Sequence, residues 1–242
     1  MPRLLTANDI INRVAIEVGL NADQDPVSSN GETYVQLKGL LDSCGQELVN
    51  LHDWQELRNV LSFTTSSADS GTYDLPDDFD HIINQTGWDR SNNFPVGGPL
   101  SAQTWTYLEG RDLVSQTIYA SFRLVDNKLD LFPQPPPDGL EVSFEYISRN
   151  WVQENTTEDR RDIVEQGSDY ILYDPLLMIR FLKLKYLWAK GLPSQGAAIE
   201  FDTMLEARKA KSTGAQVLNV ARGATNFPYL DAFHNTGDTG YG

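Results

Sequence analysis

The stretch of residues 174–190, DPLLMIRFLKLKYLWAK, constrains the fold more than any other part of the sequence. Asp174 suits a helix N-cap and Pro175 suits the first helical position, so we expect a helix to begin here. At helical spacing, apolar side chains cover most of its circumference, and its polar edge holds Arg180, Lys183 and Lys190. A helix that is apolar nearly all round belongs in the interior of a protein. We therefore predict a central helix around which the other helices pack.

A membrane-spanning helix is the competing interpretation of this stretch. About 20 uncharged apolar residues are needed to cross a bilayer, and the cations interrupt the run, so a buried helix is favoured. A stop at 191–193 and a second amphipathic helix over 196–211 are expected to follow. The central helix has two predicted apolar stripes, the first formed by Leu177, Phe181, Leu184 and Trp188 and the second by Met178, Ile179, Leu182, Tyr186 and Ala189.

Charge is distributed unevenly along the 242 residues, whose formal net charge is −15. Residues 1–174 hold 11 Lys and Arg against 29 Asp and Glu, whereas residues 175–222 hold 8 against 3. A soluble acidic surface explains this pattern, and an acidic body with one basic region kept for a partner is the sharper alternative. Tight binding of double-stranded DNA by the whole protein is disfavoured, because neutralising phosphates requires a basic footprint.

The single cysteine and the first residues of the chain suggest a protein used without crossing a membrane. Cys44 has no partner for an internal disulfide, and its helical position predicts a buried structural thiol rather than a nucleophile. Residues 1–19 lack the apolar core of a signal peptide.

Two helices are predicted near the N-terminus. Thr6, followed three residues later by Asp9, approximates a capping box, and the first helix is expected to end at Gly19. A second helix is expected to begin at Glu32 or Thr33. Its predicted apolar positions are Val35, Leu37, Leu40, Leu41, Cys44, Leu48 and Leu51.

The middle of the chain reads as β structure. β-branched and aromatic residues favour strands at 60–65, 81–88 and 140–147, and 101–108 favours a short helix. Segments 116–124 and 128–132 predict a hairpin that turns at Asp126-Asn127. Strands at this spacing indicate a small antiparallel sheet. The polar stretch 154–174 is expected to be loop with a helical turn.

This order of helices, then strands, then helices predicts the α+β class. The simplest arrangement is a discontinuous helical bundle made of residues 1–56 and 154–212, with residues 57–153 inserted as a β-rich domain. Residues 213–242 have no sustained period and read as an extended C-terminal tail. The tail is expected to dock on a partner through its large apolar groups, which are Val217, Leu218, Phe227, Tyr229, Leu230 and Phe233.

The search for chemistry finds no catalytic, cofactor-binding or metal-binding residues. The sequence has no Gly-rich phosphate loop, nucleophile elbow or Cys/His metal spacing. The histidines, His52, His81 and His234, lie in three different segments. His52 and Asp53 are adjacent and favour a surface pair at a helix end over a catalytic dyad. We predict a protein that is not an enzyme and needs no cofactor.

Three features in order resemble the head-to-tail connector adaptors of tailed, most familiarly short-tailed, bacteriophages, also called tail tubular protein A or portal-accessory proteins. The first is the opening helix LLTANDIINRVAIEVG, followed by a longer helix that ends in LVNLHDWQELR. The second is YDLPDDF at residues 73–79. The third is the strand pair FRLVDNKLDLFPQPPPDGLEVSFEYISRNWV. The resemblance covers residues 5–211.

This resemblance implies a structural virion protein at the head–tail junction, assembled in the host cytoplasm. Its expected partners are the portal protein, a tail nozzle or tail tube protein, and neighbouring copies in a ring, typically a dodecamer. The ring would extend the channel through which double-stranded DNA passes without sequence-specific binding during genome ejection. The acidic excess agrees with this role, because a wall that repels phosphates lets DNA slide.

A carbohydrate-binding or glycan-hydrolysing protein is the alternative. Aromatic side chains in and near the β-rich unit could stack on sugar rings, although packing in a core or an interface is the commoner role for such groups. The candidate residues are Trp88, Trp105, Tyr107, Tyr119 and Trp151.

Overall fold

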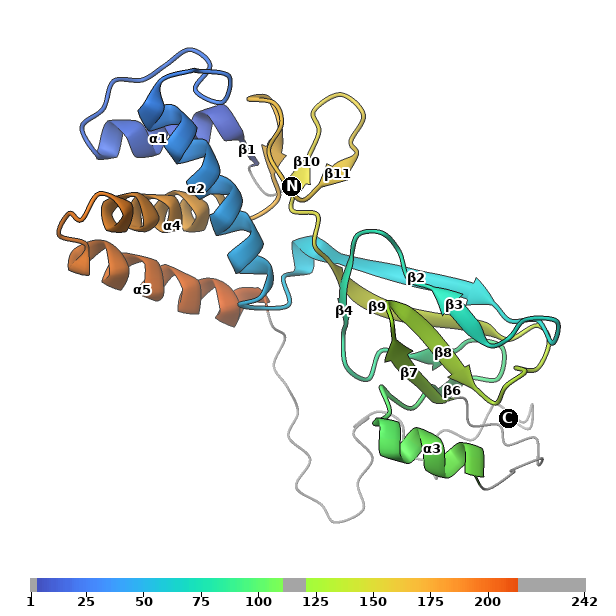
Figure 1. Cartoon of the computed structure of the whole chain (residues 1–242). Helices are drawn as coiled ribbons and strands as arrows, with labels where there is room; N and C mark the ends of the chain where they lie inside the picture. The colour runs from blue at the N-terminus through green and yellow to red at the C-terminus, as the bar shows by residue number, and fades with distance from the viewer. Residues whose placement is uncertain (1–3, 111–120, 213–242) are drawn as a thin grey trace, which may run out of the picture.

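The computed structural model describes residues 4–110 and 121–212 (Figure 1). In these residues it contains five α-helices and three antiparallel sheets, so the α+β class is confirmed. Most helices gather on one side of the molecule, and most strands lie on the other side together with the helix Ala102–Gly110 (α3) (Figure 1). Two hydrophobic clusters follow this division, and we call them the helical core and the β core.

Four helices form the helical core: α1 (Ala7–Glu17), α2 (Glu32–Val49), α4 (Pro175–Ala189) and α5 (Gln195–Ser212). Helix α4 contacts each of the other three. Phe181 and Leu184 are both buried, which confirms the prediction that this helix lies in the interior. Among the described helices, none is long and apolar enough to cross a membrane.

The predicted helix starts are confirmed in their hydrogen bonds. Thr6 and Asp9 form the capping box of α1, in which Thr6 Oγ1 accepts from the Asp9 N–H at 3.2 Å. The Asp174 carboxylate accepts from the N–H groups of Leu176 and Leu177, both at 3.1 Å. These side chains satisfy donors that a helix leaves open in its first turn, which fixes where each helix begins.

Some predicted apolar positions of the helices are exposed instead. Trp188 and Ala189 at the end of α4 are exposed, as are Val35 in the first turn of α2 and Leu51 just beyond its end. Each of these positions lies in or next to a terminal turn. Neighbouring helices no longer cover the surface there, so periodicity alone overestimates burial.

The stretch 154–174 contains one helical turn, in which the Glu158 N–H donates to the Glu154 carbonyl at 3.2 Å, and it also contributes two short strands that were not expected. The four-stranded sheet has the order β1 (Leu5–Thr6), β12 (Tyr170–Ile171), β10 (Val152–Gln153) and β11 (Arg160–Arg161). Strands of two residues are too short to show a period. The pairing of β1 with β12 holds the beginning of the chain against the segment that leads into α4.

Two further sheets enclose the β core. One runs in the order β2 (Arg58–Thr64), β9 (Glu141–Ser148), β5 (Trp88–Asp89) and β6 (Phe94–Pro95), and β4 (Phe79–Ile82) also pairs with β9. The other has the order β3 (Thr72–Asp74), β8 (Lys128–Phe132) and β7 (Ser121–Val125). The buried residues of the β core are Leu75, Val96, Phe122, Leu129, Leu131, Val142 and Phe144.

The hairpin turn is confirmed where the structure describes it. Strands β7 and β8 turn at Asp126 and Asn127, whose φ angles are 51° and 57°. Asn and Asp tolerate this left-handed conformation better than most residues. The predicted start of this hairpin, 116–120, lies outside the described residues.

The expected strand 81–88 is wrong as a single element. Its two ends belong to the separate strands β4 and β5, with a turn between them. Gln85, at φ 62°, reverses the chain there, and the Thr86 hydroxyl donates to the Ile83 carbonyl at 2.7 Å. The short helix expected at 101–108 is confirmed as α3 (Ala102–Gly110), which buries Trp105.

Strand β9 connects the two cores. Val142 and Phe144 lie in the β core, whereas Ile147 near its end lies in the helical core. Trp151 and Val152 also belong to the helical core, although they fall within the β-rich range 57–153 expected from the sequence. The chain therefore enters the helical core before its second group of helices begins.

Candidate functional site

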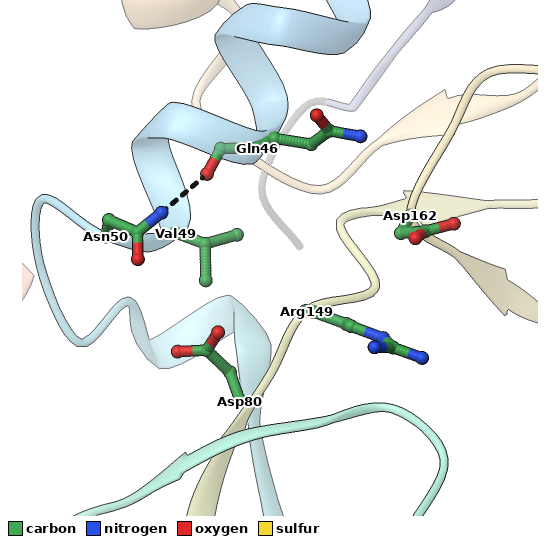
Figure 2. A pocket seen from close by; sticks show the side chains of 6 residues that line it. All are labelled: Gln46, Val49, Asn50, Asp80, Arg149 and Asp162. Carbon is green, nitrogen blue, oxygen red and sulfur yellow. Dashed lines mark hydrogen bonds between the residues drawn. The ribbon is translucent and has the colours of Figure 1, made fainter.

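The junction of the two cores contains a small polar cleft, which we call the junction cleft. It lies between the end of α2, strand β4 and the segment after β9, and its volume is about 240 Å³ (Figure 2). Carboxylates, amides and one guanidinium surround a single apolar side chain. The lining residues are Gln46, Val49, Asn50, Asp80, Arg149 and Asp162.

Arg149 is the cation of the junction cleft. Its side chain is exposed and makes no ion pair with any described residue. In Figure 2 the side chains of Arg149 and Asp162 extend toward the same side, away from α2, whereas Asp80 and Val49 face the space between helix and strand. Mixed charges and amides of this kind suit contacts with a polar partner surface, and they do not form a nucleophile–base pair.

His81 joins the two halves of the molecule beside this cleft. Its Nε2 lies 3.1 Å from Asp53 Oδ1, in the segment after α2, and its Nδ1 lies 2.6 Å from Asp80 Oδ2, on β4. A neutral imidazole has only one N–H, so both contacts are hydrogen bonds only when the ring is protonated. Partial burial alone would lower the pKa of His81, but the bonds to Asp80 and Asp53 outweigh it and raise the pKa.

The expected pair between His52 and Asp53 is wrong. The His52 ring packs edge-on against Trp54, with the ring centroids 5.0 Å apart, and Asp53 binds His81 instead. Asp53 and His81 are far apart in the sequence, and no spacing rule would have connected them. This contact becomes visible only once β4 is placed beside the end of α2.

Tight packing surrounds Gly45, the neighbour of the cleft residue Gln46 in α2. A Cβ atom added to Gly45 would lie 2.1 Å from the Trp151 indole, so a side chain cannot fit there unless the indole moves. The Trp151 Nε1–H donates to the Asp162 carbonyl at 2.7 Å, and the Tyr173 hydroxyl donates to the Gly45 carbonyl at 3.0 Å. Burial raises the pKa of the Tyr173 hydroxyl, which keeps it neutral.

Comparison with known families decides the identity. A family model described as SU10 adaptor protein matches residues 5–225. The chain belongs to the SU10 adaptor protein family. This makes it a structural adaptor protein of bacteriophages. A search of curated proteins finds no match to the chain.

The basic edge of α4 in this SU10 adaptor is used inside the chain. Arg180 Nη1 lies 3.3 Å from Glu17 Oε2 on α1 and 2.8 Å from Glu200 Oε2 on α5. Lys183 Nζ lies 2.9 Å from the same Glu17 oxygen, and the Lys190 ammonium lies over the Tyr186 ring. These cations tie α4 to its neighbours. Their role in binding a partner stays a prediction.

The carbohydrate alternative loses two of its candidate aromatic residues. Trp105 and Trp151 are fully buried, so neither can stack on a sugar. The Arg123 guanidinium carbon lies over the Trp105 ring, 4.3 Å from the centroid of that ring, and Trp151 stacks on Tyr173. Tyr107 is exposed and Trp88 is partly buried, whereas Tyr119 lies outside the described residues.

The thiol of the adaptor is buried, and its acidic groups do not gather into a metal-binding cluster in the described part of the chain. Burial raises the pKa of the Cys44 thiol, so the reactive thiolate is suppressed, in agreement with the predicted structural role. Across residues 4–110 and 121–212, no group of three or more His, Cys, Asp or Glu side chains could hold a metal ion. The six apolar residues of the predicted tail lie outside these ranges.

Proposed function

We propose that this SU10 adaptor forms a ring beneath the portal, joins the capsid to the tail and extends the DNA channel. The family match over residues 5–225 carries the proposal. Short-tailed phages, a twelve-membered ring and passage of DNA during ejection are parts of the same proposal. The chain acts by assembly with the portal, a tail protein and copies of itself, and it catalyses no reaction.

The charge of the chain supports a channel wall that does not bind DNA tightly. The formal net charge is −15, and several cations near the helices are already paired with carboxylates of the same chain. Phosphates approaching such a wall find few free cations, so the salt-dependent binding typical of DNA-binding proteins does not develop. DNA can then move through the channel without being held.

The two cores support separate roles for two domains of the adaptor. We assign residues 1–56 and 154–212 to a helical domain and residues 57–153 to a β-rich domain. The helical domain provides a rigid body, and the junction cleft marks where a partner can contact both domains. The C-terminal residues after the helical domain dock on the portal or on a neighbouring copy.

Electron microscopy of the assembled complex tests the proposal. The purified adaptor alone is expected to sediment as a monomer, because like charges oppose packing of identical copies. Mixed with portal rings of its own phage, it is expected to add a second ring beneath the portal. A portal from an unrelated phage is the control. Portals that remain bare at saturating adaptor concentration would contradict the proposal.

A tail variant tests the docking of the C-terminal residues. Replacing Phe227, Tyr229, Leu230 and Phe233 together by Ala is expected to abolish attachment to portal-bearing heads, because apolar burial supplies the binding energy. The matched control replaces polar residues of the same segment, Asn226 and Asn235, by Ala. Attachment of both variants at the wild-type level would mean that these aromatic and aliphatic groups do not dock.

A further inference from the structure

Strand β2 forms a free edge of the five-stranded sheet. Its seven residues pair with β9 in an unbroken register from Arg58↔Ile147 to Thr64↔Glu141. No described residue pairs with its other side. Figure 1 shows β2 along the outer margin of the β core. The outward-facing backbone N–H and C=O groups of this seven-residue strand are therefore open to a further strand.

The outward groups can be identified from the neighbours of β9. The Glu141 carbonyl accepts from the Arg90 N–H at 2.7 Å and the Glu145 carbonyl accepts from the Ile83 N–H at 2.9 Å, both on the side of β9 away from β2. In an antiparallel pair, residues opposite such positions also face outward. Thr64 and Val60 are those residues, and Ser62 lies between them. Their N–H and C=O groups make no hydrogen bond with the described residues.

This edge lacks the features that usually block strand addition. Proteins protect edges with Pro, with bulges, with Lys or with very short strands. Strand β2 has no Pro or Lys and no bulge, and its only charge, Arg58, is paired with Glu145 at 3.4 Å. By contrast, β6 has two residues and contains Pro95, and β3 has three residues. Val60 on the outer face is 63% exposed.

The end of α5 lies next to the start of this edge. The Gln55 side-chain amide donates to the carbonyl of Ser212, the last residue of α5, and Gln55 precedes β2 by three residues. In Figure 1 the end of α5 adjoins the segment between α2 and β2. The four residue steps from Ser212 to Gln216 span at most about 14 Å. The residues after 215 can therefore reach the first residues of β2 and continue along it.

Residues 216–221, QVLNVA, have the composition of a strand that would fit this position. They are uncharged, and β-branched Val217 and Val220 favour extended backbone. With alternate residues on opposite faces, Leu218 and Val220 would extend the inner face formed by Leu61 and Phe63, which are half-buried against the β core. A strand from a second copy is less suitable, because each copy carries a net charge of −15.

We propose that residues 216–221 add to the free edge of β2 in the same chain, as a parallel strand. The outward N–H and C=O groups of Val60, Ser62 and Thr64 pair with this segment, and Leu218 and Val220 cover the inner face. Of the apolar tail residues, Leu218 then packs within the chain instead of on a partner, and residues 223–242 leave the far end of β2 and remain available to a partner. The pairing is a property of the isolated chain and does not depend on the adaptor role.

Cross-linking of the purified full-length protein tests the pairing. In the double variant Ser62→Cys and Asn219→Cys, both thiols lie on the outer face of adjacent strands, and a short bifunctional thiol reagent is expected to join them within one chain. The product is a monomer of increased mobility on a denaturing gel. Ser62→Cys with Val220→Cys, which places the second thiol on the inner face, is expected to react at least tenfold more slowly. The unmodified chain controls for Cys44, which is buried.

A proline at the edge separates strand addition from folding. Ser62→Pro removes an outward N–H and leaves the ladder with β9 intact, because Pro is tolerated on the open side of an edge strand. In the cross-link test residue 62 already carries a cysteine, so the proline is placed at the neighbouring outward position, Val60. Val60→Pro in the Ser62→Cys, Asn219→Cys background is expected to lower cross-linking at least tenfold and to leave the circular dichroism spectrum unchanged. Cross-linked dimers in place of monomers would assign the strand to a second copy. Equal cross-linking of Asn219→Cys to Ser62→Cys and to Asp74→Cys on β3 would also overturn the proposal.

Discussion

The helical core and the β core of this adaptor differ in size and in closure. Among the described residues, the helical core buries 31 hydrophobic residues and the β core buries 7. The helical core is enclosed by four helices and a small sheet. The β core lies between two sheets, one of which ends on β2, a strand whose outer edge is open among the described residues. Stability of the chain thus rests mainly on the helices, and the β core depends more on its polar contacts and on what covers its edge.

The largest expected effect comes from truncation in the helical core. Phe181→Ala removes a buried ring that stacks on Phe201 at 4.4 Å between centroids, and is expected to cost about 3–5 kcal/mol of unfolding free energy. Phe63→Ala is the matched change in the β core. Its ring is only partly buried, so a loss of about 1–2 kcal/mol is expected. Urea unfolding followed by circular dichroism measures both, and equal losses would contradict the contrast between the cores.

A second pair of variants sharpens the comparison within one helix. Gly45→Ala places a methyl group against the Trp151 indole and is expected to destabilise the protein by about 1–3 kcal/mol. Gly39→Ala, on the exposed face of α2 with no atom near the added Cβ, is expected to stabilise it by about 0.5–1 kcal/mol. Thermal unfolding gives both signs in one experiment. Stabilisation by both changes would show that Trp151 moves aside without cost.

The smallest effect concerns the junction between the cores. The raised pKa of His81 means that its bonds to Asp53 and Asp80 contribute fully below about pH 6.5, the ordinary value, and are lost as pH rises through the raised pKa. The His81 side chain is 42% exposed, so solvent screening limits the change to a few tenths of a kcal/mol. Urea midpoints between pH 6 and 8.5 should fall for the native chain and stay level for His81→Gln. A native midpoint that rises over this range would contradict the assignment.

Sequence patterns predicted the elements that have a clear local cause. The capping box at Thr6, the cap at Asp174 and the turn at Asp126-Asn127 are each determined by a few neighbouring residues, and all three were confirmed. The interior position of α4 followed from its nearly uniform apolar surface. Patterns predicted these features because the interactions that create them act over three or four residues.

The remaining features depend on contacts between distant segments. The sheet of β1, β10, β11 and β12 uses strands of two residues, which have no period to detect. The Asp53–His81–Asp80 contact and the fit of Trp151 over Gly45 join residues far apart in the chain. The exposure of Trp188 depends on where neighbouring helices end. None of these can be derived from local propensity, because tertiary packing determines them.

The helical core is built from helices early and late in the sequence, and this order has a consequence for synthesis on the ribosome. Helices α1 and α2 emerge first, but α4, which covers their apolar faces, is made roughly a hundred residues later, on the order of ten seconds at usual elongation rates. Strands β2 to β9 emerge within that interval and can fold while the first helices still expose their apolar stripes. The nascent chain is therefore most prone to aggregation just before α4 leaves the exit tunnel, and chaperone binding should concentrate on α1 and α2 in that window.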